Sequence, residues 1–111
     1  MCINNKAKFR TDIVIVHPTD FAPVSSVTSV VDNKWHLLVG KYDGSTVSVY
    51  VDGKFENSSN FNHGIGSNNS ELIIGNDPDC PNRFFNGIID DIRIYNRALS
   101  EEEIKVLYKK K

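Results

Sequence analysis

The segment that decides the fold reads DNKWHLLVGKYDGSTVSVYVDGKF and spans residues 32–55. In its second half, valines alternate with other residues at positions 47, 49 and 51, which is the two-residue period of a β-strand. Asp52 and Gly53 follow at once, and an Asp-Gly pair favours the positive φ values of a tight type I′ turn. The segment therefore predicts a hairpin, with a strand over 46–51, its valines on one face, and a short return strand over 54–56.

The same kind of pattern extends in both directions from this hairpin. Short runs rich in Val, Ile, Phe and Tyr lie between pairs and clusters of Gly, Pro, Asn and Asp, as in an all-β sandwich or barrel. These runs predict further strands over 8–16, 25–31, 34–42, 71–75 and 87–95.

One helix is predicted, near the end of the chain. Ser100 is a good N-cap residue, and Glu103 stands at the position that completes a capping box. Leu99 and Ile104 occupy the positions of a hydrophobic staple around this cap. We expect a short helix over 101–108.

Composition limits the classes of function. The chain has 111 residues, with 13 Lys and Arg against 14 Asp and Glu, so its formal net charge is −1. This size predicts a single domain over 1–111, and the charge offers no basic surface for nucleic acid or an anionic membrane. No apolar run is long enough to span a membrane, and the first residues do not read as a signal peptide. The chain is therefore expected to be intracellular or a piece of a longer protein.

Two blocks of the sequence carry a family resemblance. Residues 32–55 contain W-H, Y-D-G and Y-V-D-G, and residues 84–108 read FFNGIIDDIRIYNRALSEEEIKVLY. In this order and spacing they resemble the laminin G-like domains of the concanavalin A-like lectin and glucanase superfamily. The resemblance implies an antiparallel jelly-roll β-sandwich, in agreement with the strands counted from the pattern.

The resemblance also implies that strands are missing. Whole domains of this family have several strands before the counterpart of Lys8, so this chain resembles the C-terminal part of a single laminin G-like domain. Absent strands leave sheet edges unpaired. We therefore expect the chain to form a homo-oligomer or to dock on a partner chain that completes the sandwich.

Catalysis is not expected. The glucanases of this superfamily use paired carboxylates on one strand, and no pair of glutamates in this chain has that spacing. Cys80 and the histidines at positions 17, 36 and 63 form no local nucleophilic motif. His36 is expected at an outward polar position beside a core tryptophan, and Cys2 and Cys80 are either bridged or free thiols.

Asp90 is the most informative acid. Strand alternation places it on one face with Ile88, Ile92 and Ile94, so we expect it to be at least partly buried and paired. The resemblance implies a structural calcium ion at this aspartate, although Ca²⁺ needs six to eight oxygens and relatives draw most of them from the missing region. The alternative is that Asp90 accepts backbone N–H groups or pairs with Arg93 or Arg97. Asp91 and Arg93 are expected to form a cross-strand charge pair.

The best candidates for ligand binding lie in the loop after residue 75. It carries side chains that can hydrogen-bond sugar hydroxyls, namely Asn76, Asp77, Asp79, Asn82 and Arg83. Trp35, Tyr42 and Tyr50 are expected in the core, and would give a stacking face if exposed. Sequons at Asn57 and Asn68 predict surface loops.

Taken together, the residues and the resemblance predict a non-catalytic module that binds carbohydrate or a protein surface. It is expected to belong to a larger extracellular or cell-surface protein. The alternative is a structural segment that completes a sandwich with another chain and has no ligand of its own.

Overall fold

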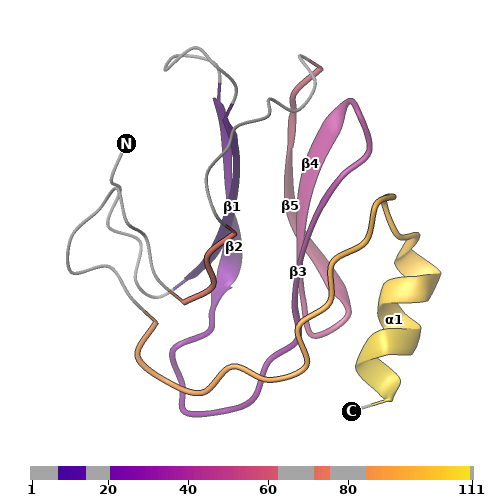
Figure 1. The fold of residues 1–111 in the computed structure, drawn as a ribbon. Coiled ribbons are helices and arrows are strands. Elements are labelled where there is room, and N and C mark those ends of the chain that lie inside the picture. Colours follow the sequence, from indigo (N-terminus) through magenta and orange to yellow (C-terminus); the bar gives the residue numbers. More distant parts are fainter. Residues whose placement is uncertain (1–7, 15–20, 63–71, 76–84, 111) are drawn as a thin grey trace. The chain divides into compact units, whose positions relative to one another are not determined.

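The computed structural model describes residues 8–14, 21–62, 72–75 and 85–110 (Figure 1). By its internal contacts the chain divides into two units. The described residues of the larger unit are 8–14, 21–62 and 95–110, and those of the smaller unit are 72–75 and 85–94. All helices and strands of the described residues belong to the larger unit, and they are β1 (Lys8–Val14), β2 (Phe21–Ser29), β3 (Leu38–Tyr42), β4 (Thr46–Val51), β5 (Lys54–Asn60) and α1 (Glu101–Lys109).

The strands form two antiparallel sheets. β1 pairs with β2, and β3, β4 and β5 form a second sheet with β4 in its centre. At the turn between β4 and β5, Asp52 and Gly53 have φ angles of 53° and 81°. Positive φ at both central residues is the type I′ geometry, so the predicted hairpin is confirmed. β4 has the predicted bounds, whereas β5 continues to Asn60.

β4 is covered on both faces. On one face a cluster between the two sheets contains Val24, Val47, Val49 and Phe61. On the other face a second cluster contains Tyr50, Leu99 and Ile104. Figure 1 shows the resulting layers of the larger unit, with α1 on the side of the three-stranded sheet away from β1 and β2. The predicted alternation along β4 is confirmed, as is the class of antiparallel β-structure with one C-terminal helix.

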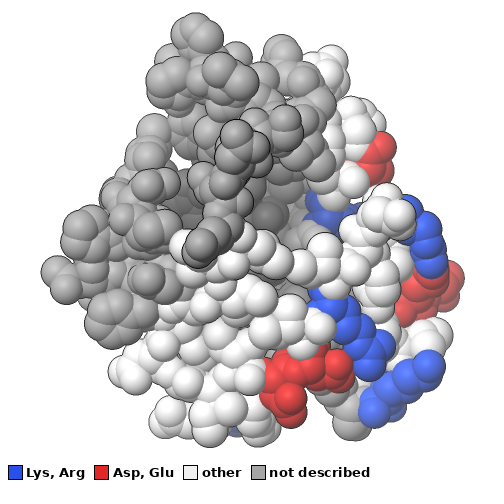
Figure 2. Space-filling model, viewed as in Figure 1, with Lys and Arg blue, Asp and Glu red and all other residues white. Residues whose placement is uncertain are grey.

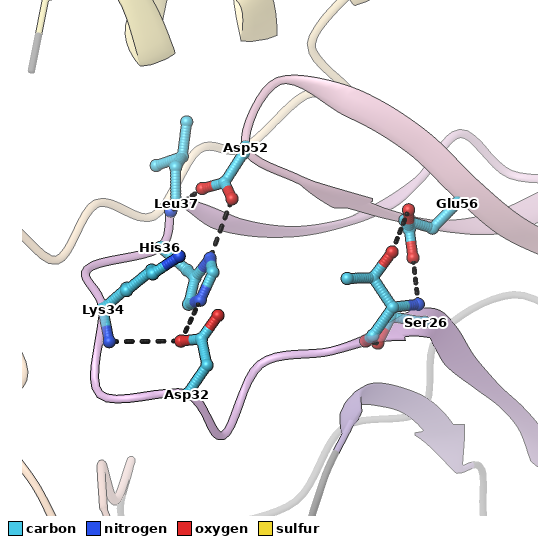
Figure 3. A network of polar contacts seen from close by, with 8 residues as sticks. Ser26, Asp32, Lys34, His36, Leu37, Asp52 and Glu56 are labelled. Carbon is cyan, nitrogen blue, oxygen red and sulfur yellow. Dashed lines mark hydrogen bonds and ion pairs between the residues drawn. The ribbon is translucent and has the colours of Figure 1, made fainter.

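The two sheets are also joined through a carboxylate. Glu56 Oε1 of β5 accepts hydrogen bonds from the backbone N–H groups of Val27 and Thr28 in β2, at 2.9 and 2.6 Å. Its Oε2 accepts the Thr28 hydroxyl at 3.0 Å, and the neighbouring Asn57 amide donates to the Ser25 carbonyl at 3.1 Å. Figure 3 shows Glu56 reaching across to β2. Side chains of β5 thus satisfy backbone groups of β2 at the register shift of the β1–β2 pair, where no strand of the described residues pairs with them.

The helix begins and is capped as the sequence predicts. The Ser100 hydroxyl accepts from the Glu103 N–H at 3.2 Å, and the Glu103 carboxylate accepts from the Ser100 N–H at 3.0 Å. Arg97 holds the same carboxylate with two N–H groups, one of them at 2.9 Å. Leu99 and Ile104 pack in one cluster, as a hydrophobic staple requires.

Two predicted strands are absent from the described residues. Residues 72–75 and 85–95 contain no strand, although the Gly75 carbonyl accepts from the Phe85 N–H at 2.7 Å. Alternation of apolar side chains defines the faces of a strand, but a strand also needs a neighbouring edge to bond. The predictions over 71–75 and 87–95 are therefore wrong for the residues described, and Ile88, Ile92 and Ile94 are exposed.

Candidate functional site

Trp35 is an exposed aromatic residue. It lies in the loop over residues 30–37, between β2 and β3, and is 68% exposed. We expected it in the core because residues 34–42 read as one strand. β3 instead begins at Leu38, so Trp35 falls outside the alternation that buries one face of the sheet. Of the other two aromatics, Tyr50 is buried, and Tyr42 is partly buried against the cluster between the sheets, as expected.

Hydrogen bonds shape both ends of the loop around Trp35. On its N-terminal side, Asp32 Oδ1 accepts from the Lys34 N–H at 3.1 Å, and Asn33 between them has a φ of 61°. On its C-terminal side, Asp52 of the β4–β5 turn accepts from the Leu37 N–H at 3.0 Å and donates its own N–H to the Leu37 carbonyl at 2.9 Å. The indole is thereby presented on a backbone that is tied to a tight hairpin.

His36 connects these two ends. Its Nδ1 lies 2.7 Å from Asp52 Oδ2 and its Nε2 lies 2.7 Å from Asp32 Oδ1, as Figure 3 shows. The side chain is 13% exposed, so the expected outward position is wrong. A ring bonded by carboxylates at both nitrogens is best satisfied as the imidazolium, which donates twice. Neither nitrogen is left to act as a base on a substrate.

The charged groups of this cluster stabilise one another's charged forms. Hydrogen bonds to Asp52 and to Asp32 raise the pKa of His36 above its usual 6.5. In turn, the hydrogen bond to His36 lowers the pKa of Asp32 below its usual 3.8. This cluster was not predicted from the sequence. The local part could have been found, since an Asp followed by Asn favours an Asx turn, but the contact with Asp52 depends on how the loop folds onto the hairpin.

The predicted ligand-binding loop lies outside the part of the chain that the structure describes. Asn76, Asp77, Asp79, Asn82 and Arg83 all lie outside the described residues, as do Cys2, Cys80 and Asn68. Asn57 is exposed, but it lies in β5 rather than in a loop. These residues keep the status of predictions.

Asp90 differs from its prediction. It is exposed, and its Oδ1 accepts from the N–H of Asp91 at 2.8 Å, which is the backbone alternative considered for it. The predicted burial is wrong because no strand forms there. Arg93 bonds Asp91 at 3.0 Å within one irregular segment, not across strands, and Arg97 bonds Glu103.

The described residues do not by themselves fit a calcium site. Among them, no three His, Cys, Asp or Glu side chains are grouped so as to hold a metal ion. Ca²⁺ takes six to eight oxygens, and Asp90 already bonds its neighbour's N–H. Calcium at Asp90 remains a prediction that depends on ligands from elsewhere.

A shallow apolar groove follows α1. Its volume is about 340 Å³, and it is lined by Tyr95, Arg97, Leu99, Glu102, Glu103, Val106 and Leu107. On the face of the molecule in Figure 2, basic and acidic side chains of the described residues are interspersed. No helix of the described residues has the length and hydropathy of a membrane span.

Comparisons with known proteins agree with this architecture. A stretch of 61 residues, 55% of this chain, is 44% identical to an asparagine-rich protein of Margaritifera margaritifera, of which it covers 8%. The solved structure of part of an S-layer domain-containing protein from Clostridium thermocellum matches 97% of this chain with a TM-score of 0.60. That match covers 66% of the solved chain at 19% identity, and so concerns the fold alone. The chain thus spans only part of the length of each of these two proteins.

The family model of laminin G domains, described as the concanavalin A-like lectin/glucanases superfamily, matches residues 4–105. Since this match takes in nearly the whole chain, the protein belongs to the laminin G-like family of the concanavalin A-like superfamily.

Proposed function

We propose that this chain is a non-catalytic binding module that recognises carbohydrate, or a protein surface, through Trp35. The observation that carries the proposal is the 68% exposure of this indole on a loop that Leu37 and His36 tie to Asp52 of the β4–β5 turn. Membership of a lectin superfamily supports a binding role. The family and the S-layer neighbour favour an extracellular or cell-surface setting.

The chemistry around Trp35 suits a sugar. An indole offers an apolar face with a polar N–H, which can stack on the C–H face of a pyranose ring while hydroxyl groups bond at its edge. Asp32 makes its two bonds through Oδ1, so Oδ2 is available to accept a hydroxyl. Lys34 is exposed two residues further on and can donate. Because the loop is already fixed, little entropy is lost on binding.

A glycan array tests this function. The wild-type chain is expected to give selective signals that Trp35→Ala removes. Val31→Ala is the matched control, since Val31 is also apolar, lies in the same loop and is equally exposed at 68%. Signals that survive Trp35→Ala but vanish in Asp79→Ala or Arg83→Ala would move the binding site to the predicted loop. No selective signal for any glycan or for a protein ligand would refute the proposal.

A second candidate function is the assembly segment. It is favoured by the described residues of the smaller unit, where exposed large apolar side chains are concentrated, namely Leu72, Ile73, Ile74, Phe85, Ile88, Ile89, Ile92 and Ile94. Such a concentration is typical of surfaces that another chain covers. Sedimentation of the wild type and of Ile92→Asp tests it. Self-association that the aspartate abolishes is the expected result, and a wild-type monomer at micromolar concentration that binds no partner chain would exclude it.

A further inference from the structure

The cluster of Asp32, His36 and Asp52 does more than hold a loop, because its central group changes charge near neutral pH. We propose that the proton on His36 controls the ligand surface at Trp35: the imidazolium fastens the loop over residues 30–37 to the β4–β5 turn, and deprotonation releases its N-terminal half. This inference rests on the proposed function, since it concerns the regulation of the same surface.

The two short contacts are both satisfied when each ring nitrogen carries a proton. Nδ1 and Nε2 each lie 2.7 Å from a carboxylate oxygen, which is the distance of a charge-assisted hydrogen bond. A neutral imidazole has one N–H and one lone pair. When a proton leaves to water, one nitrogen therefore presents its lone pair to a carboxylate, and that contact turns from attraction into repulsion.

The two contacts are not equally supported. Asp52 is held independently, because its carboxylate also accepts the Leu37 N–H and its own N–H bonds the Leu37 carbonyl. Asp32 is held to the rest of the cluster through His36, and its bond to the Lys34 N–H lies within the same loop. The Nε2 contact with Asp32 is thus the one that opens. Trp35 lies between these two attachment points in the chain, so its position depends on both.

The charges around the ring set the direction of the response. The groups that face the ring are Asp32 from the loop and Asp52 from the β4–β5 turn, and Lys34 acts on Asp32 from within the loop. Both carboxylates raise the pKa of His36 above 6.5. The loop is therefore fully fastened below the ordinary histidine pKa and loosens as the pH rises through the higher value of the folded protein. Because the pKa of Asp32 is lowered, the fastening persists into acid solution.

Tryptophan fluorescence reports directly on the conformation of this loop. Trp35 is the chain's single tryptophan and is adjacent to His36, so emission excited at wavelengths that tyrosine does not absorb comes from this loop alone. Quenching by acrylamide, a neutral molecule, measures how accessible the indole is without responding to charge. The experiment follows emission and acrylamide quenching of the full chain from about pH 5 to pH 9, a range that brackets histidine titration. The imidazole resonances are followed in parallel by NMR.

We expect one transition in both fluorescence and quenching, with its midpoint above 6.5 and equal to that of the His36 resonances. Asp32→Asn should lower the midpoint, since it removes one of the two charges that hold the proton. His36→Gln should abolish the transition. The double variant His17→Gln/His63→Gln is the matched control, because it removes the other histidines of the chain and should leave the transition unchanged. Asp32→Asn keeps the test valid should His36→Gln fail to fold, because Asp32 is exposed.

Glycan affinity measured on both sides of the transition then tests whether the transition changes ligand binding at Trp35. The glycan that gives the strongest array signal should bind roughly tenfold more weakly on the alkaline side, because a released loop holds the competent position for only part of the time. A midpoint at or below 6.5, or a transition that survives His36→Gln, would overturn the inference. So would a clear transition with equal glycan affinity on both sides of it. A transition with no glycan bound at any pH would instead refute the proposed function while leaving the release of the loop established.

Discussion

Replacing Ile104 by alanine tests whether α1 is held to the sheet by packing. Ile104 is fully buried, at 0% exposure, in the cluster with Tyr50 and Leu99. The change removes three carbon groups, and at about 0.8 kcal/mol for each buried group the transfer loss is roughly 2.4 kcal/mol. Incomplete closure of the cavity raises the expected destabilisation to about 3–4 kcal/mol. That is a large share of the stability of a domain of 111 residues.

Urea denaturation followed by far-UV circular dichroism measures this loss. With a slope of about 1.5 kcal/mol per molar urea, the midpoint should fall by roughly 2–2.7 M. Val106→Ala is the matched control, because Val106 lies in the same helix and is 50% exposed, and we expect a change within about 0.5 kcal/mol. Equal effects of the two substitutions would refute the reasoning, since they would show that α1 is not docked through Ile104.

Three further predictions concern local contacts. Glu56→Ala should destabilise the chain by about 1–3 kcal/mol, as measured by urea denaturation, because two backbone N–H groups of β2 lose their acceptor; no change would mean that water replaces the carboxylate without loss. The hydrogen bond from Arg97 is the largest cause that lowers the pKa of Glu103 from 4.5 to about 2. The ionised Glu103 carboxylate therefore contributes its full share of stability above pH 4.5, and this share is lost as the pH falls toward 2. Glu103→Gln should flatten that part of the stability profile, and an unchanged slope would contradict it. Gly53→Ala places a Cβ 3.2 Å from Tyr108 Cβ at a φ of 81°, and should lower the midpoint of thermal unfolding more than Gly44→Ala, which meets open space at a φ of 98°.

The elements that could be predicted from the sequence are those determined by interactions between residues that are close together in the chain. Ser100 and Glu103 bond each other across three positions, and Asp52 and Gly53 form a turn by themselves. Both features depend on local conformational preference, so no knowledge of the rest of the fold was needed. The alternation along β4 was predictable for the same reason.

The candidate site could not be predicted in the same way. His36 lies 16 positions from Asp52 in the sequence, and their contact exists because the loop folds back on the β4–β5 turn. The pattern of residues 34–42 predicts Trp35 in the core, whereas in the structure a turn at Asp32 and Asn33 precedes Trp35 and β3 begins only at Leu38. The Asx turn at the start of the predicted strand thus places Trp35 on the surface rather than in the core.

The segment over residues 88–95 shows where alternation ceases to be sufficient evidence. Its pattern defines an apolar face, yet its backbone has no strand pairing among the described residues and its isoleucines are exposed, Ile88 at 75%, Ile92 at 53% and Ile94 at 71%. Fully burying one such side chain is worth roughly 1.5–3 kcal/mol. A chain that offers both a free strand edge and an apolar surface would therefore gain several kcal/mol by pairing here, in addition to the backbone hydrogen bonds. Such pairing would turn the alternation into the two faces of a strand, and this is the physical argument for the assembly role proposed above.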